Sequence, residues 1–206
     1  MTVSTSKLLT YIFIGRSGCG KGTQSKLMID YIKQTAGLAE NPVLHVETGA
    51  HLREFIQGPS LASREAKQIM DAKELQPSFV SNFIWSKVLI ENVTGEEHLI
   101  IDGSPRKLVE AQILDSGLSF LGRVKPKVVH LNVSREWSKE RLLDRGRADD
   151  DILGIEKRLD WFDGEVAPVI EFFRNADNFD YLDINGEQPI EKVHQDILEQ
   201  SNLNNI

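Results

Sequence analysis

A glycine-rich segment near the start of the chain constrains the fold more than any other feature of the sequence. It reads GRSGCGKGT from Gly15 to Thr23 and fits the pattern G-x-x-x-x-G-K. An apolar run at 11–14 precedes it, and a helix-like stretch from residue 21 to about 33 follows it. Glycines allow consecutive backbone N–H groups to turn toward a polyphosphate, and a helix N-terminus adds a positive dipole. The segment therefore predicts a phosphate-binding loop between a strand and a helix.

The side chains of this loop predict how a nucleoside triphosphate would be held. We expect Lys21 to reach the β- and γ-phosphate oxygens. Gly22 stands where such loops usually carry Ser or Thr, so Thr23 is the candidate hydroxyl near a magnesium ion. Asp102 ends an apolar run and is expected near the same ion, with both contacts mainly through water. We predict ATP with Mg²⁺, bound by Gly15, Gly18, Cys19, Gly20, Lys21, Gly22 and Thr23.

Short apolar runs alternate with longer helical patterns along the rest of the chain. The further runs lie at 43–46, 99–101, 128–131 and 179–184. They are nearly continuous rather than alternating, which is typical of parallel strands buried on both faces. Pro168 interrupts a helical stripe and predicts a kink or break there. We predict an α/β protein with the P-loop NTPase fold, a five-stranded parallel sheet flanked by helices, and ligands at the carboxyl ends of the strands.

Composition limits the partners that we expect. The 206 residues suit a single domain over 1–206, and no linker divides them. The net charge of −7 argues against a nucleic-acid partner. The single cysteine, Cys19, excludes a disulfide framework and a cysteine-based zinc site, and we interpret it as a small loop filler rather than a nucleophile. No segment predicts a signal peptide or a membrane span, so we expect a cytoplasmic monomer.

Arginines that occur in ordered motifs indicate which reaction the nucleotide-binding fold would catalyse. TGxxLR lies at 48–53, DGSPR at 102–106, and Arg141, Arg145, GRxDD at 146–150 and Arg158 follow. Phosphoryl transfer to a phosphate needs no general base, because the acceptor is already anionic. It needs positive charge around the transferred group, which arginine supplies bidentately. Together with GKGTQ at 20–24, these motifs resemble the adenylate kinase family over nearly the whole chain.

The resemblance implies a role for each of these charged residues. Arg53 and Arg106 would grip the acceptor phosphate. Arg141, Arg145, Arg147 and Arg158 would surround the donor phosphates and the transferred group, with Arg147 and Arg158 also reaching the acceptor. Asp149 and Asp150 would help to position these arginines. The implied catalytic residues are Lys21, Arg106, Arg141, Arg145, Arg147 and Arg158. The remaining arginines are interpreted as solvated residues or members of surface ion pairs; they are Arg16, Arg64, Arg123, Arg135 and Arg174.

The resemblance also implies which residues contact the two nucleosides and where the acceptor-binding lobe and the lid lie. By resemblance, Thr48, Gly49 and Gly103 would contact the acceptor, and Gln76 would lie where backbone groups touch its nucleoside. Asn185 and Gly186 would form the turn near the donor adenine. A small helical acceptor-binding insertion would occupy about 48–90, and a very short lid about 145–150. Trp85, Trp137 and Trp161 are interpreted as core or helix-packing residues rather than base-stacking platforms.

The chain departs from the family pattern at three places. Arg16 and Ser17 stand where the family usually has proline in the phosphate loop. Glu110 replaces a glutamine that reads the acceptor adenine; an ionised glutamate can accept from an exocyclic amino group but cannot donate. A single glycine separates Arg145 from Arg147, so the lid is minimal. We expect more ATP hydrolysis than in a long-lid enzyme, and phosphate release from ATP alone would test this; a negligible rate beside ADP formation with AMP would refute it.

The predicted activity is transfer of the γ-phosphate of ATP to AMP. Glu110 keeps UMP, CMP or GMP open as alternative acceptors. A protein of another class, which binds nucleotides and regulates a partner with little turnover, is also consistent with a minimal lid. Retention of Lys21 and the motif arginines speaks against that second alternative, since binding alone would not require the full set.

Overall fold

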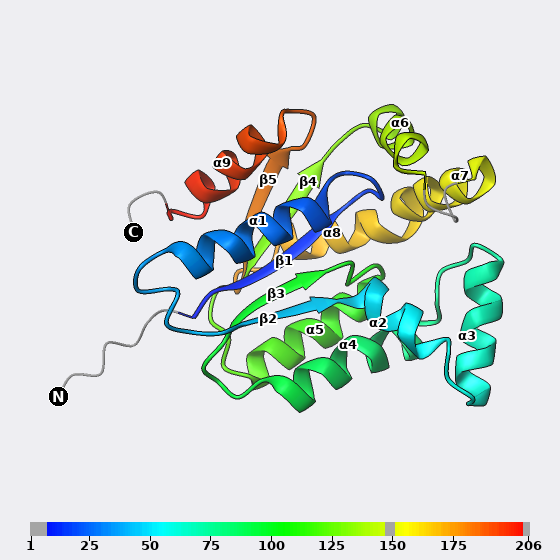
Figure 1. Cartoon of the computed structure of the whole chain (residues 1–206), viewed down its shortest axis with the longest axis horizontal. Coiled ribbons are helices and arrows are strands. Elements are labelled where there is room, and N and C mark those ends of the chain that lie inside the picture. The colour runs from blue at the N-terminus through cyan, green and yellow to red at the C-terminus, as the bar shows by residue number, and fades with distance from the viewer. Residues whose placement is uncertain (1–7, 147–150, 204–206) are drawn as a thin grey trace.

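The structure is a computed structural model that describes residues 8–146 and 151–203. Its centre is one parallel sheet in the order β2-β3-β1-β4-β5, which confirms the predicted fold class (Figure 1). The strands are β1 (Thr10–Gly15), β2 (Val43–Glu47), β3 (His98–Asp102), β4 (Lys127–Asn132) and β5 (Asp180–Asn185). The chain order reverses around β1, so the carboxyl ends of β1, β3 and β4 open toward a shared edge where α/β proteins bind ligands.

Helices cover both faces of the sheet. They are α1 (Lys21–Gln34), α2 (Thr48–Phe55), α3 (Leu61–Asp71), α4 (Ser78–Asn92), α5 (Leu108–Phe120), α6 (Arg135–Arg145), α7 (Ile152–Trp161), the π-helix η1 (Phe162–Val166), α8 (Ala167–Arg174) and α9 (Ile190–Gln200). Side chains of α1 and α9 pack in one buried cluster with the sheet. Those of α4, α5, η1 and α8 pack in another, on the opposite face (Figure 1).

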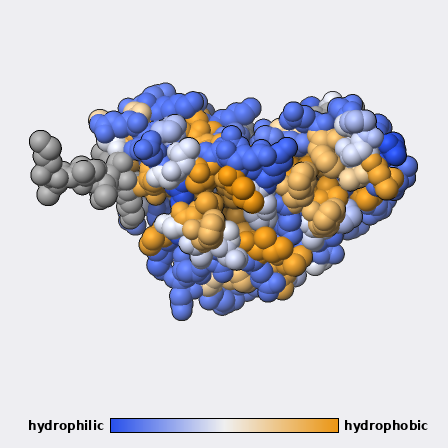
Figure 2. Space-filling view, turned by 90° about the horizontal axis from the view of Figure 1, so that it is seen from below, coloured by the Kyte–Doolittle hydropathy of each residue, from blue (hydrophilic) through white to orange (hydrophobic). Residues whose placement is uncertain are grey.

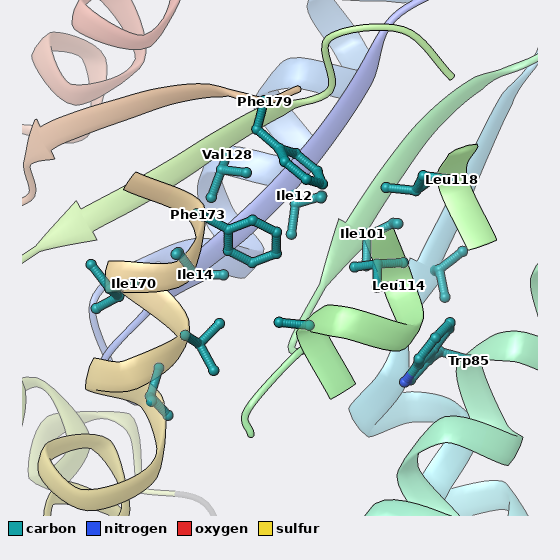
Figure 3. Packing of buried hydrophobic residues seen from close by; sticks show 14 of the residues in the cluster. Ile12, Ile14, Trp85, Ile101, Leu114, Leu118, Val128, Ile170, Phe173 and Phe179 are labelled. Atoms are coloured by element: carbon teal, nitrogen blue, oxygen red, sulfur yellow. The ribbon is translucent and has the colours of Figure 1, made fainter. Parts of the chain in front are cut away.

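The apolar run of β1 is buried on both faces because its side chains alternate between these two clusters. Tyr11 and Phe13 belong to the cluster of α1 and α9, whereas Ile12 and Ile14 belong to the other. On that second face Phe173 and Phe179 pack edge to face, with ring centroids 4.9 Å apart, close to Ile12 (Figure 3). Two apolar layers on one strand explain why the sequence shows a continuous run rather than an alternating one.

The chain between β2 and β3 forms α2, α3 and α4, and α3 projects away from the sheet (Figure 1). A small cluster of its own, centred on Ala66, Val80 and Ile84, holds these helices together. Gln76 is buried there and donates from Nε2 to the carbonyl of Ala66 at 2.8 Å. Further along α4, Trp85 packs into the main core. The segment is therefore a helical extension rooted in the sheet domain, at the place where we predict the acceptor-binding lobe.

A π-helical turn, η1, interrupts the helical stripe just before Pro168, where the sequence predicted a kink or break. The N–H of Ala167 donates to the carbonyl of Phe162, five residues earlier, and Pro168 lies in the first turn of α8. Proline has no N–H to donate and cannot sit inside a regular helix without disturbing it. Phe162 and Asp163 of this widened turn contact Arg16 of the phosphate loop.

Apolar side chains gather on the outer faces of α4 and α5, on the side of the molecule that Figure 2 shows. Exposed members include Phe79 and Ile90 of α4 and Ile113 of α5. Of the helices in the described ranges, none has the length and apolarity needed to span a membrane.

Candidate active site

The phosphate loop follows β1 and lies against β4 and α6. Gly15, Gly18 and Gly20 have φ values of 141°, 86° and 99°, which side-chain-bearing residues rarely adopt. A Cβ added to Gly15 would lie 2.6 Å from the carbonyl oxygen of Leu131, and one added to Gly18 would lie 3.0 Å from Leu142 Cγ. Glycine is therefore required for both the turn and the close packing, which supports the prediction made from the motif.

Lys21 is the first residue of α1 and closes over this loop. Its ammonium donates to the carbonyls of Gly15 at 2.9 Å and Arg16 at 2.8 Å. Cys19 Sγ lies 3.6 Å from the same nitrogen and is buried. Burial raises the pKa of the Cys19 thiol, which keeps it protonated and suits a filler of the loop. These two carbonyls hold the Lys21 ammonium at the cleft, and within 8–146 and 151–203 no ion pair joins it to a carboxylate.

Asp102 stands at the end of β3, next to the loop. It is buried, and its Oδ2 would lie 3.5 Å from a Cβ added to Gly22. Burial raises the pKa of Asp102, while the Lys21 charge opposes that rise. Thr23 is exposed in the first turn of α1. Of the predicted metal-associated residues, Thr23 thus belongs to the first turn of α1 and Asp102 lies next to Gly22 of that turn; the described residues form no group of three or more His, Cys, Asp or Glu that could hold a metal ion.

The residues predicted to hold the acceptor come together where β2 and β3 end. Their last residues, Glu47 and Asp102, are register partners. A Cβ added to Gly103 would lie 3.8 Å from Arg106 Nη2, 3.9 Å from the backbone nitrogen of Gly49 and 4.0 Å from Thr48 Cβ. The TG and DG motifs, far apart in sequence, are therefore in contact in the fold.

Both acceptor-side arginines lie at this meeting point. Arg53 Nη1 would lie 3.3 Å from a Cβ added to Gly49, and its Nη2 donates to Glu47 at 3.2 Å. Arg106 donates from Nε to the carbonyl of Gly103 at 2.9 Å, a bond that fixes its direction without cancelling its charge. The placement supports the predicted roles of Arg53 and Arg106.

Glu110 has a contact that the sequence did not indicate. It is almost fully buried in the first turn of α5, and its Oε2 accepts from the backbone N–H of Arg106 at 2.8 Å. The Glu110 side chain therefore caps the turn that leads into α5, one residue before the N-cap Lys107, whereas a capping-box glutamate would bond the N–H of the N-cap itself. The same bond links Glu110 to the backbone of an acceptor-side arginine.

One cleft contains cations from three elements. It is bounded by the phosphate loop at Gly15 and Ser17, by the turn after β3 and by one face of α7 and η1. Lys21, Arg106 and Arg158 all line it. Arg158 belongs to α7 and donates from Nε to the carbonyl of Gly154 at 3.0 Å. Trp161 also lines the cleft, so it is more than the packing residue that we expected, whereas Trp85 is buried in the core as predicted.

The arginines of α6 lie beside the phosphate loop rather than among the lining residues of that cleft. Leu142 packs against Gly18, which places α6 on the loop. The neighbouring Arg141 is exposed and stacks over Trp137, with its guanidinium carbon 4.5 Å from the ring centroid. Arg145 ends α6 before Gly146, which has a φ of 61°. The predictions for Arg147, Asp149 and Asp150 fall outside the described residues.

The turn after β5 also reaches the phosphate loop. Gly186 donates from its backbone to Asn132 at 2.9 Å, and a Cβ added there would lie 3.7 Å from the carbonyl of Cys19. Beside it is an open cavity of about 420 Å³, lined by Asn132, Val133, Ser134, Asp183, Asn185 and Glu187. Asn185 and Gly186 therefore lie beside the phosphate loop and an open cavity, and their contact with the donor adenine stays a prediction.

Two arginines that we interpreted as surface residues are placed differently. Arg123 forms a buried ion pair with Glu97 and also donates to the Glu97 carbonyl at 2.7 Å, so the surface interpretation is wrong. Arg16 is only 16% exposed; it pairs with Asp163 at 2.7 Å and stacks on Phe162, which lines the cleft. No motif signals either contact, because each partner is distant in sequence. Arg135 and Arg174 form exposed ion pairs, as expected.

These features define a P-loop protein of the phosphotransferase class, with cations gathered where two phosphates would meet. Residues 13–178 match the family model described as adenylate kinase. The chain belongs to the adenylate kinase family, which confirms the resemblance that the motifs indicated.

Relatives with curated names agree over most of the chain. It is similar to "Adenylate kinase 1" of Nostoc sp., with 30% identity over 187 residues that cover 90% of this chain and 95% of the relative. It is similar to "Adenylate kinase 1" of Synechocystis sp., with 35% identity over 88% of this chain and 91% of the relative. An "Adenylate kinase" of Corynebacterium glutamicum is 32% identical over 89% of this chain and 93% of its own length.

Proposed function

We propose that the protein transfers the γ-phosphate of ATP to AMP. The observation that carries the proposal is the single cleft lined by Lys21, Arg106 and Arg158, at the switch point of a parallel sheet. Names of relatives that match most of the chain support the same reaction. The donor phosphates would lie on the loop amides and the α1 N-terminus, and the acceptor phosphate would lie on Arg53 and Arg106.

Charge, rather than acid–base chemistry, drives the proposed transfer. A monophosphate oxygen is already an anionic nucleophile, so the barrier comes from bringing two polyanions together and from charge on the transferred group. Lys21 and Arg158 line the same cleft, and both would face that group. Arg106 is directed by the Gly103 carbonyl and stays available for the acceptor. The chain's own residues therefore bind, orient and neutralise both phosphates.

Mg²⁺ is proposed as the cofactor that accompanies ATP. Thr23 is exposed in the first turn of α1, and Asp102 lies next to Gly22 of the same turn. A site with so few protein ligands suits Mg²⁺, because this ion keeps several waters and binds substrate phosphates. The ion would supply further neutralisation of the phosphate oxygens. Asp102 would hold its waters, and Lys21 beside it favours the ionised carboxylate.

Glu110 supports an acceptor base with an amino group. Its Oε2 is engaged by the backbone of Arg106, and a carboxylate can only accept from a base. Adenine, cytosine and guanine offer an exocyclic amino donor, whereas uracil and thymine do not. Among these amino-bearing bases we favour adenine, because the relatives are named adenylate kinases; uracil and thymine would offer the carboxylate only their ring N3–H.

A panel of acceptors tests the proposal. ADP formation from ATP is measured with AMP, GMP, CMP, UMP and dTMP at equal concentrations, beside Lys21→Met and Arg106→Ala variants. We expect the highest kcat/KM with AMP and near-background rates in both variants. UMP as the best acceptor would refute the assignment of AMP. Turnover of the unmodified protein at the level of the variants would instead favour the nucleotide-binding regulator.

Lobe and lid boundaries, the monomeric state and a cytoplasmic location stay predictions. Size-exclusion chromatography with light scattering would test the monomer, and a dimer mass would contradict it.

A further inference from the structure

Arg16 connects the phosphate loop to the opposite wall of the cleft. Its Nε donates to the carbonyl of Val133 at 3.2 Å, directly after β4. Its Nη1 lies 2.7 Å from Asp163 Oδ1, and its guanidinium carbon lies 4.1 Å from the centroid of the Phe162 ring. Only 16% of the side chain is exposed. A loop residue is therefore fixed to the end of a strand and to the first turn of η1.

Both catalytic walls depend on these contacts. The carbonyl of Arg16 accepts from Lys21 at 2.8 Å, so the backbone of this residue helps to direct the ammonium. Phe162, on which the Arg16 guanidinium stacks, lines the cleft beside Arg158 and follows the helix that carries it. Movement of Arg16 would thus change the separation of Lys21 and Arg158.

Asp163 is itself held in place. Its Oδ2 accepts from Arg135 Nη1 at 3.1 Å, and Arg135 also pairs with Glu156 at 2.6 Å and Asp160 at 2.8 Å. Arg135 opens α6, whereas the three acids belong to α7 and η1. The Arg16 contact therefore ends on a fixed carboxylate rather than on a freely rotating one.

We propose that Arg16 is a positioning residue that fixes the phosphate loop against the α7–η1 wall, so that Lys21 and Arg158 face the same phosphoryl group. The proposal rests on the proposed function. The charge-assisted hydrogen bond to the Val133 carbonyl gives the Arg16 side chain its direction, and the ion pair with Asp163 adds attraction to η1. Geometry of this kind matters for the rate, since a displacement of about 1 Å can cost about a hundredfold. The loop lacks proline and has Ser17 next to Arg16, so its stiffness must come from contacts like these.

Arg16→Ala tests the proposal, with Arg174→Ala as the matched control. Arg174 also combines an ion pair, with Glu171, and a stack, 5.1 Å over Tyr181, but neither of these partners lines the cleft, whereas Phe162 under Arg16 does. We expect Arg16→Ala to raise the KM for ATP about tenfold and lower kcat about tenfold, in line with a modest displacement. The KM for AMP should change less than about twofold, because Arg53 and Arg106, which would hold the acceptor phosphate, lie in α2 and in the turn after β3 rather than in the elements that Arg16 contacts. Arg174→Ala should change none of the three.

Two further variants separate positioning from general stability. Arg16→Lys keeps the charge but lacks the planar fork that reaches Val133 and Asp163 together, so it should recover only part of the loss. In a double-mutant cycle, Arg16→Ala with Asp163→Asn should be no worse than Arg16→Ala alone. Melting temperatures of Arg16→Ala and Arg174→Ala should be similar.

The proposal is overturned if Arg16→Ala changes the kinetics no more than Arg174→Ala, or if the effects of Arg16→Ala and Asp163→Asn simply add. A protein that transfers no phosphate to AMP would refute the proposed function instead. Calorimetric ATP binding then decides the positioning role: weaker binding in Arg16→Ala than in Arg174→Ala supports it, and equal binding overturns it.

Discussion

The two ends of β3 carry the same kinds of residue and use them differently. At the amino end, Glu97 and Arg123 form a buried pair in which both side chains are 4% exposed. His98 beside them is bonded at both ring nitrogens, to Leu9 at 2.9 Å and Leu38 at 3.1 Å. At the carboxyl end, in the part of the chain that the structure describes, no ion pair joins Asp102 to Arg106, which donates to a backbone carbonyl instead.

This difference separates charges that stabilise the fold from charges kept for ligands. A buried cation that meets a carboxylate and a carbonyl has no capacity left for a phosphate. A cation oriented only by carbonyls keeps its full charge, as Lys21 and Arg106 do. Substitutions at the two ends should therefore affect different quantities, catalysis at one and stability at the other.

The largest expected effect is at the carboxyl end. Lys21→Met removes the ammonium at the loop and should lower kcat/KM about a thousandfold, in the range for loss of one preorganised charge. The midpoint of denaturant unfolding should stay nearly unchanged, because the carbonyls that Lys21 binds remain close to the cleft and to water. Lys192→Met, which removes a surface partner of Asp196, is the control and should leave the rate unaffected. Equal rates in Lys21→Met and Lys192→Met would show that Lys21 takes no part in the reaction.

At the amino end of β3 we expect substitutions to change stability rather than catalysis. Arg123→Met leaves the Glu97 carboxylate buried without its cation and should lower the free energy of unfolding by about 3–5 kcal/mol. Chemical denaturation measures this, and kcat/KM at a temperature where the variant is folded should be unchanged. The difference between the two ends of β3 would be contradicted by an Arg123→Met variant that is as stable as the unmodified protein, or by one that has lost turnover while folded.

Local patterns predicted the carboxyl end better than the amino end, for a physical reason. The loop from Gly15 to Thr23 needs glycine at fixed places in one short segment, so its role is legible from the sequence. The fold class followed from the nearly continuous apolar runs, because such runs are typical of parallel strands that are buried on both faces of a sheet. The contacts of Arg16 with Asp163, and of Arg123 with Glu97, join residues that are distant along the chain. Which cation is neutralised depends on tertiary packing, and no spacing rule contains that information.

A smaller effect is expected at Glu110, which joins both roles because it caps the turn that leads into α5 and lies at the acceptor side. Glu110→Gln can still accept from Arg106 N–H through its carbonyl, so stability should change by less than about 1 kcal/mol. The amide adds a donor toward the acceptor base. The ratio of kcat/KM for AMP to that for UMP should therefore shift by about tenfold or less, the range for one neutral hydrogen bond. An unchanged ratio across the acceptor panel would show that Glu110 is only a cap.

The smallest expected effect is the pH dependence of stability at the amino end. Burial raises the pKa of Glu97, but the hydrogen bonds from Thr94 and Gly95 and the charge of Arg123 outweigh it, so the net pKa lies below the ordinary value of 4.5. A lowered folded-state pKa means that Glu97 contributes stability above pH 4.5, and that this contribution is lost as the pH falls through the folded-state pKa.

Glu97→Gln should therefore flatten the decline in unfolding free energy below pH 4.5, relative to the unmodified protein. Each pH unit by which the pKa is lowered corresponds to about 1.4 kcal/mol. Unfolding by urea at several pH values between neutrality and the acid limb measures the slope. Glu199→Gln, at an exposed position of α9, serves as the control and should retain the full slope. If Glu97→Gln kept that slope too, the acid sensitivity would come from other carboxylates, and the amino-end pair would be stabilising without being a titrating element.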